Sequence, residues 1–203
     1  TQGVSSAASD VYKRQASGGS AGNSMIATAL MGAPTYMSCK VAQDTDGDIY
    51  LSDLEQSGVA HGLNDQRKEG VTGKCLVLIT PDAERSLNTH LGISETLSVD
   101  EVNEEAIKAS QWVYLEGYLV TSATGHAAAL KTKALAAQHQ IQTAVSFSDP
   151  GMVKFFRDNM AAMVEGGVDL VFCNKIEALE WGQCDSLDDL SLIHISEPTR
   201  RRG

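Results

Sequence analysis

The sequence predicts an α/β fold with a mainly parallel central sheet, and two observations lead to that prediction. Between Trp112 and Cys173, apolar runs with little alternation are separated by segments of helical composition. Strands that are apolar throughout are typical of parallel sheets covered by helices on both faces, and right-handed crossovers then connect them. A chain of 203 residues, 42% of them hydrophobic, is also long enough to bury a sizeable core.

Charge and hydropathy argue against two kinds of partner. The formal net charge is −10, whereas general nucleic-acid binding needs a basic surface. No apolar run approaches the roughly 20 residues that a membrane-spanning helix needs. We therefore expect a cytoplasmic protein that binds neither nucleic acid nor membrane.

The cysteines indicate the same compartment. The sequence contains no C-x-x-C pair, and three of the four cysteines lie in apolar, strand-like runs. We therefore expect reduced core thiols in a cytosolic protein rather than metal ligands or disulfides. The four are Cys39, Cys75, Cys173 and Cys184.

The two ends of the chain differ from its middle. Residues 1–15 contain Val-Ser-Ser-Ala-Ala-Ser-Asp-Val-Tyr-Lys-Arg-Gln, and residues 191–203 contain Ser-Leu-Ile-His-Ile-Ser-Glu-Pro-Thr-Arg. Both look like translated sequencing adapters, and the alternative is a pair of disordered tails. We exclude them from fold reasoning and expect residues 16–190 to be an internal fragment of a larger domain.

The first elements are expected to follow a glycine-rich loop, Gly18-Gly19-Ser20-Ala21-Gly22-Asn23. One side of the second helix would carry Ile49, Tyr50 and Leu54. Ser57-Gly58 is then typical of a helix stop. The elements predicted here are a helix over 24–31, a short strand over 35–41 and a helix over 47–56.

A hairpin is predicted next. Two β-rich runs, 75–80 and 85–91, are joined by Pro81-Asp82-Ala83-Glu84. Because Pro and Asp suit turn positions, the two runs should pair as antiparallel strands.

After the hairpin, helices and strands alternate, and polar residues should gather at the carboxyl ends of the strands. Glu116, Asp149, Asn174 and Glu177 occupy such positions. The elements predicted here are a helix over 99–109, a strand over 112–116, a helix over 122–139, a strand over 141–147, an amphipathic helix over 152–164, a buried strand over 168–173 and a last helix after Asn174.

Short motifs form an ordered set along residues 16–190. They are Gly18-Gly19-Ser20-Ala21-Gly22-Asn23-Ser24, Ser38-Cys39-Lys40-Val41-Ala42 with Asp44 and Gly47-Asp48, Thr72-Gly73-Lys74-Cys75, Thr80-Pro81-Asp82-Ala83-Glu84-Arg85, Leu91-Gly92, Glu116-Gly117-Tyr118, Phe147-Ser148-Asp149-Pro150 and Asn174-x-x-Glu177. Together they resemble the ribokinase-like (PfkB) family of carbohydrate and nucleoside kinases, especially its bacterial adenosine kinase-like members. The resemblance implies a three-layer α/β/α fold with a small β lid, with N- and C-terminal parts of that fold missing.

The resemblance also implies a substrate site. Gly18, Gly19 and Asn23 match the signature whose amides and Asn side chain hold sugar hydroxyls. A glycine loop before a helix N-terminus suits such ligands, although it also serves simply to pack a tight turn. Glu116 matches a strand-end position near the sugar in some members, and its alternative interpretation is a solvated carboxylate.

Asn174 and Glu177 match a motif that organises Mg²⁺ and phosphate, partly through water. Three positions apart at a helix start, the two side chains face the same way, and hard oxygen ligands suit Mg²⁺. The alternative is a capping box. Asp149 similarly has two interpretations, a substrate or supporting carboxylate and the N-cap of the next helix.

The hairpin over about 72–92 matches the family's lid, which closes over the sugar and excludes water. Arg85, near its turn, would reach a phosphate in the closed state, or else be an exposed arginine without a role. In parts of the family the lid also mediates homodimerisation.

The reaction implied is transfer of the ATP γ-phosphoryl to a primary hydroxyl of a ribose-containing substrate, with adenosine favoured. The family's base, the Asp of a Gly-Ala-Gly-Asp motif, has no counterpart in this sequence, so we expect the chain itself to be inactive. Two alternatives are a non-catalytic dimerising or ligand-binding module and a serine hydrolase. The second would use Ser20 in a G-x-S-x-G elbow.

Overall fold

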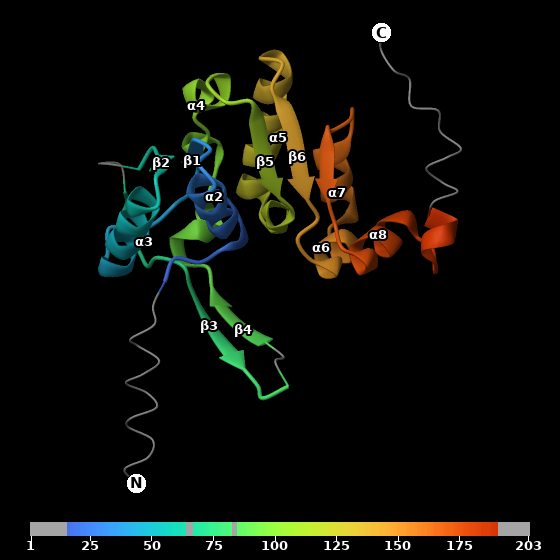
Figure 1. Ribbon diagram of the computed structural model, residues 1–203, viewed down its shortest axis with the longest axis horizontal. Coiled ribbons are helices and arrows are strands. Elements are labelled where there is room, and N and C mark those ends of the chain that lie inside the picture. Colours follow the sequence, from blue (N-terminus) through green and yellow to red (C-terminus); the bar gives the residue numbers. More distant parts are fainter. Residues whose placement is uncertain (1–15, 64–66, 83–84, 191–203) are drawn as a thin grey trace. The chain divides into compact units, whose positions relative to one another are not determined.

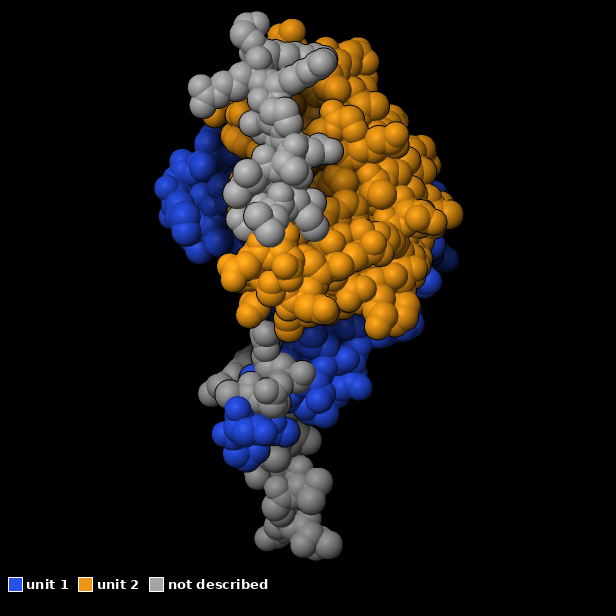
Figure 2. Space-filling model, turned by 90° about the vertical axis from the view of Figure 1, so that its right-hand side faces the viewer, with its two compact units in different colours: residues 1–97 blue, residues 98–203 orange. Residues whose placement is uncertain are grey.

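The computed structural model describes residues 16–63, 67–82 and 85–190. Contacts between Cα atoms divide the chain into two units, residues 1–97 and residues 98–203 (Figure 2). The segments 1–15 and 191–203, interpreted above as tails, lie outside the described residues.

Unit 1 has a small parallel sheet with two helices beside it. Strand β1 pairs with β2 in parallel, from Thr35 opposite Val59 to Met37 opposite His61. Its core consists of Cys39, Val41, Leu51, Leu54 and Val59. The elements are α2 (Ser20–Leu30), β1 (Thr35–Met37), α3 (Thr45–Gln56), β2 (Val59–His61), β3 (Lys74–Ile79), β4 (Arg85–His90) and a 3₁₀ helix (Gly92–Thr96).

The predicted hairpin is confirmed. Strands β3 and β4 pair in antiparallel register, from Lys74 opposite His90 to Ile79 opposite Arg85. Figure 1 shows the pair projecting away from α2 and α3 of the same unit. All the described side chains of β3 and β4 are exposed, including the apolar Leu76, Leu78 and Leu87.

Unit 2 has a parallel three-stranded sheet in the order β5-β6-β7. Glu116 at the end of β5 lies opposite Ser146 of β6, which lies opposite Phe172 of β7. The elements are a 3₁₀ helix (Val99–Glu101), α4 (Glu104–Lys108), β5 (Trp112–Glu116), a 3₁₀ helix (Gly117–Thr121), α5 (Ala123–Gln138), β6 (Gln142–Ser146), α6 (Pro150–Phe155), α7 (Arg157–Val164), β7 (Leu170–Phe172) and α8 (Lys175–Gly182) (Figure 1).

The core of unit 2 lies between its helices and one face of this sheet. Leu115 and Val145, which lie opposite one another on β5 and β6, contribute from the strands. Val153, Met160 and Met163 of α6 and α7 are fully buried against them. The amphipathic stripe expected over 152–164 therefore packs in the core, as its spacing predicts.

The predicted start of the first helix was wrong. Helix α2 begins at Ser20, directly after Gly19, whose φ of +88° is accessible to glycine at little cost. Gly22, expected in a loop, is a buried helical residue. A Cβ there would lie 2.7 Å from the Tyr50 hydroxyl oxygen, so this glycine permits close helix packing instead of a turn.

Two predicted helices are each split in two. Over 99–109, the Ser98 side chain caps a 3₁₀ turn and the Asn103 side chain caps α4, so two starts replace one. Over 152–164, Phe156 leaves helical geometry (φ −122°, ψ 33°) between α6 and α7, and its ring packs on the core.

On α3, Leu51 and Leu54 are buried, whereas Ile49 is exposed. Two expectations of burial were wrong. Strand β7 is exposed along its length because, in the described sheet, it has a neighbour on one side only. Cys75 and Cys173 are exposed, whereas Cys39 is buried, and all four thiols are free.

The core of unit 2 predicts the cost of one truncation. Met160→Ala should lower the free energy of unfolding by roughly 2–5 kcal/mol, because it leaves a cavity at a fully buried site. Met31→Ala, the same change at a side chain that is 87% exposed, is the control and should cost little. Urea unfolding of both variants is the measurement, and equal costs would contradict the assignment of the core.

Candidate functional site

Three parallel strands of unit 2 bring polar residues to one edge of the sheet. Glu116 is the last residue of β5, Asp149 follows β6, and Asn174 follows β7. Because parallel strands end on the same side, these three positions lie along one carboxyl edge, as expected from the sequence. This carboxyl edge is the candidate site of unit 2.

The Glu116 carboxylate is buried at this edge, with 7% of the residue exposed. Its two oxygens accept hydrogen bonds from the Tyr114 hydroxyl (2.9 Å) and from Ser148 Oγ (2.7 Å). Ser148 Oγ in turn accepts from the Gly117 amide at 2.8 Å. The alternative interpretation of Glu116 as a solvated carboxylate was therefore wrong, since the carboxylate is buried and Tyr114 and Ser148 hold it in place.

The backbone after β6 is strained where it serves this carboxylate. Ser148 has a φ of +67°, a conformation that non-glycine residues adopt at a cost of about 1–3 kcal/mol. Next to it, Asp149 Oδ1 accepts from the Gly151 amide at 2.7 Å and caps α6. The N-cap interpretation of Asp149 is thus confirmed.

A tyrosine hydroxyl lies among the acidic groups of the carboxyl edge. The Tyr118 hydroxyl donates to the Ser148 carbonyl oxygen at 3.3 Å. Its pKa is raised, first by partial burial and then by the negative charges of Asp149, Glu116 and Glu177. All three carboxylates therefore act on one point of the edge.

Asn174 and Glu177 form the capping box that was one of their two interpretations. The Asn174 side-chain oxygen accepts from the Glu177 amide (2.9 Å), and Glu177 Oε2 accepts from the Asn174 amide (3.0 Å). The Asn174 side-chain amide also donates to Glu177 Oε1 at 2.7 Å. This pair holds the Glu177 carboxylate rigidly, with 5% of the residue exposed.

The donor set at Glu177 suits a hydrated cation better than a directly bound one. Among the described residues, no group of three His, Cys, Asp or Glu side chains is placed to bind a metal ion. Each Glu177 oxygen accepts one hydrogen bond from Asn174, and a carboxylate oxygen can accept two. The remaining capacity fits water molecules around a divalent cation.

In unit 1, Gly18, Gly19 and Asn23 lie at the start of α2. Among the described residues, no side chain caps this helix, so its first amides are free of side-chain acceptors there and suit an external one. Asn23 is exposed one turn into the helix, and its backbone amide donates to the Gly19 carbonyl at 2.9 Å. An uncapped helix start beside an exposed amide side chain suits a ligand with hydroxyl groups.

Two other predicted positions also belong to unit 1. The backbone of Arg85 begins β4, next to residues 83–84, which lie outside the described residues. Ser20 begins α2, and residues 16–19 ahead of it form no strand. Ser20 therefore lacks the strand that a nucleophile elbow requires immediately before the serine.

Sequence reasoning missed the groups that hold Glu116. Tyr114 lies two positions before Glu116 on the same strand, and this spacing places both side chains on one face, so the signal was present. Ser148 had no comparable signal, because its contact with Glu116 spans 32 positions.

These elements define the class of the protein: an α/β fold with an antiparallel hairpin and an acidic carboxyl edge. The pfkB family of carbohydrate kinases matches residues 9–195, and the chain belongs to this family. Kinases of this family use ATP as co-substrate, usually with a divalent metal ion.

Individual relatives agree with this assignment. An adenosine kinase from Schizophyllum commune is 32% identical over 143 residues, covering 66% of this chain and 40% of that protein. The crystal structure of adenosine kinase from Sinorhizobium meliloti has a TM-score of 0.84 and 29% identity, covering 94% of this chain and 60% of that one. A probable sugar kinase from Rhizobium etli CFN 42 has a TM-score of 0.82 and 31% identity, covering 94% and 59%.

The structural matches confirm the ribokinase-like fold. The chain spans 40% of the matched S. commune enzyme and about 60% of the two matched structures. None of the helices in the described ranges is long and apolar enough to cross a membrane.

The capping box predicts a graded loss of stability. Asn174→Ala removes the acceptor of the Glu177 amide and should lower the free energy of unfolding by about 1 kcal/mol. Asn174→Ser keeps an acceptor at the N-cap and should lose much less. Urea unfolding of both variants tests this, and an equal loss for Ala and Ser would show that the cap is not the stabilising contact.

The acidic edge predicts a shift in a tyrosine titration. Asp149→Asn removes a negative charge but retains an oxygen for the Gly151 amide, so the pKa of Tyr118 should fall toward its ordinary value. Tyrosinate absorbance during alkaline titration measures this, with Tyr118→Phe assigning the signal. Asp158→Asn on α7 is the control, and an unchanged pKa in Asp149→Asn would be the opposing result.

Proposed function

We propose that the chain is part of an ATP-dependent kinase that phosphorylates a primary hydroxyl of a ribose-containing substrate, adenosine foremost. The observation that carries this is the uncapped start of α2, with Asn23 exposed beside it, in a chain of the pfkB family. The matched adenosine kinases from S. commune and S. meliloti support adenosine over a simple sugar. We place the protein in the cytoplasm, where ATP is available.

Each candidate group has a separate role in this proposal. The first amides of α2 and the Asn23 side chain bind sugar hydroxyls, which orients the hydroxyl that attacks. Glu116, held by Tyr114 and Ser148, is a rigid acceptor for another hydroxyl or for ordered water. The β3–β4 hairpin covers the substrate and excludes water, and Arg85 contacts a phosphate when the hairpin closes.

Glu177 and Asn174 are assigned to the metal and phosphate end of the reaction. Glu177 orients water molecules around a cation, and Asn174 keeps the carboxylate from rotating. Bound Mg²⁺ would neutralise charge on the ATP phosphates during transfer.

The 203-residue chain is proposed to lack kinase activity on its own. Phosphoryl transfer in this family uses an Asp base within Gly-Ala-Gly-Asp, and that motif does not occur in the sequence. Steady ATP-dependent phosphorylation of a nucleoside by the purified chain would refute this proposal.

A second candidate function is a non-catalytic module that dimerises through the hairpin. The strand register places the exposed apolar side chains of Val77, Ile79 and Leu87 on one face of the hairpin, and they favour this candidate because contiguous apolar surface often marks an interface. Sedimentation velocity distinguishes the two candidates when combined with nucleoside binding: a defined dimer that binds no nucleoside would favour the module.

The proposed sugar contact predicts a loss of affinity. Asn23→Ala should weaken adenosine binding by roughly tenfold, the effect of losing one or two hydrogen bonds, without lowering stability. Isothermal titration of the chain with adenosine gives the dissociation constants. Thr28→Ala on the same helix is the control, and equal affinity of Asn23→Ala and the unsubstituted chain would remove Asn23 from the site.

A further inference from the structure

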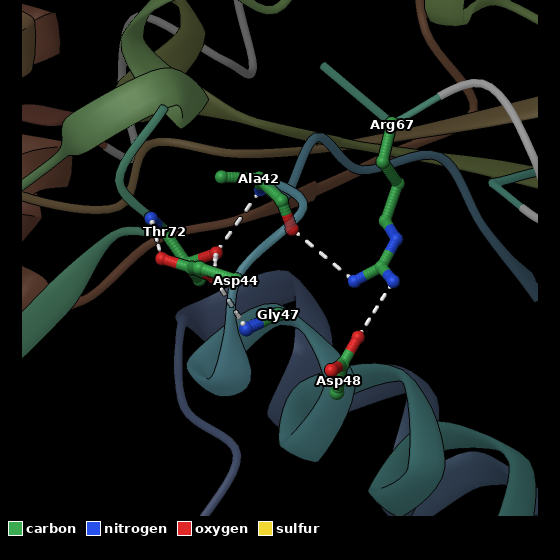
Figure 3. Close-up of polar contacts among 6 residues, drawn as sticks. All are labelled: Ala42, Asp44, Gly47, Asp48, Arg67 and Thr72. Carbon is green, nitrogen blue, oxygen red and sulfur yellow. Dashed lines mark hydrogen bonds and ion pairs between the residues drawn. The ribbon is translucent and has the colours of Figure 1, made fainter. Parts of the chain in front are cut away.

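One carboxylate links α3 to the base of the β3–β4 hairpin. Asp44 Oδ1 accepts from the Gly47 amide at 2.8 Å and thereby caps α3. The same side chain accepts from Thr72 twice, from Oγ1 (2.5 Å, at Oδ1) and from the backbone amide (2.9 Å, at Oδ2) (Figure 3). Thr72 stands two residues before the first residue of β3.

The Thr72 side chain completes this connection. Its hydroxyl also accepts from the Ala42 amide at 3.0 Å, and only 4% of the residue is exposed. A Cβ on Gly47 would lie 2.3 Å from the Ala42 carbonyl oxygen and 3.0 Å from Thr72 Oγ1, so the segments touch closely. We call Ala42, Asp44, Gly47 and Thr72 the Asp44 clamp.

The charge of Asp44 is maintained within the clamp. Burial would raise the pKa of this carboxyl, but hydrogen bonds from Thr72 and Gly47, together with Lys74, outweigh burial and lower it. The ionised carboxylate can therefore accept from all its donors at neutral pH.

Close to the clamp, the segment that follows β4 is hydrogen-bonded to the segment that precedes β3. The Ile93 amide donates to the Val71 carbonyl oxygen at 2.8 Å, one residue before Thr72. Gly92 has a φ of +53°, and a Cβ there would lie 2.1 Å from the same oxygen. Holding Thr72 in place therefore holds both the start of β3 and the segment that follows β4.

Beyond this base, few contacts among the described residues orient the hairpin. All the described side chains of β3 and β4 are exposed. Lys74 pairs with Asp46 of α3, but both side chains are partly exposed, and such pairs are worth only about 0–1 kcal/mol. The direction of the hairpin is therefore set mainly at its base.

We propose that Asp44 is a positioning residue that fixes the base of the β3–β4 hairpin to α3, so that the hairpin covers the substrate as one rigid piece. That the hairpin covers the substrate rests on the proposed function. That Asp44 fixes the base of the hairpin does not, because this contact can be measured without substrate.

Amide exchange followed by NMR tests the clamp. In Asp44→Asn, the remaining side-chain oxygen can still accept from the Gly47 amide. The NH₂ group that replaces the other oxygen cannot accept from Thr72, so Thr72 loses an acceptor. The Ile93 amide touches neither residue, yet its exchange should accelerate roughly 5- to 10-fold, as expected when about one hydrogen bond of stability is lost. Exchange at the Ser57 amide, at the far end of α3, should stay unchanged.

Matched variants separate the clamp from general destabilisation. Thr72→Val should accelerate Ile93 exchange as Asp44→Asn does, whereas Thr72→Ser, which retains the hydroxyl, should restore slow exchange. Asp53→Asn, the same change farther along α3, alters a contact with the Ser17 amide that lies outside the clamp and should have no effect. Unchanged Ile93 exchange in Asp44→Asn, or equal acceleration in Asp53→Asn, would overturn the proposal.

Spin-label distances test the orientation of the hairpin directly. Labels at Ser52→Cys on α3 and Ser86→Cys on β4, with Cys75, Cys173 and Cys184 changed to Ser, should give a narrow distribution that Asp44→Asn broadens. An equally narrow distribution in Asp44→Asn would also overturn the clamp. A narrow distribution together with no adenosine binding would remove the proposed function and leave the clamp standing.

Discussion

The parallel register of β5, β6 and β7 is the constraint on which the carboxyl edge depends. Because the three strands run in one direction, the residues after each of them emerge on one side of the sheet. Glu116, Asp149 and Asn174 are far apart in the sequence and become neighbours only through this register. The gathering of negative charge around Tyr118 is its direct consequence.

Hydrogen bonds hold these acidic side chains in place, and the loss of such bonds to a buried carboxylate would destabilise the fold. A buried carboxylate is stable only when partners replace its water, and Tyr114 and Ser148 do so for Glu116. Ser148 adopts positive φ to reach it. Backbone strain at this point is therefore matched by the satisfaction of a buried charge.

Helix caps organise both units in a similar way. Asp44, Ser122, Asp149 and Asn174 each accept a backbone amide at the start of a helix. Two of these capping side chains make a further hydrogen bond. Asp44 accepts from the Thr72 amide at the base of the hairpin, and the Asn174 side-chain amide donates to the Glu177 carboxylate. Helices α2 and α7, by contrast, begin without a side-chain cap among the described residues.

The sequence by itself determined the alternation of helices and strands and the hairpin, and it gave the caps at Asp149 and Asn174 as one of two interpretations of each residue. These features depend on neighbours within a few positions, whose spacing is visible in the chain. Strand β5 and helix α5 fall almost where their composition predicts, because each has clear limits on both sides.

Only the tertiary structure decided the burial of Glu116, the exposure of β7 and the contact of Asp44 with Thr72. Burial depends on which strands and helices become neighbours, and no local pattern records that. Gly22 is an example. The sequence predicts a loop residue there, but in the structure Gly22 lies inside α2, where the Tyr50 side chain packs closely against it. Local chemistry sets where elements begin, and long-range packing sets what their side chains can do.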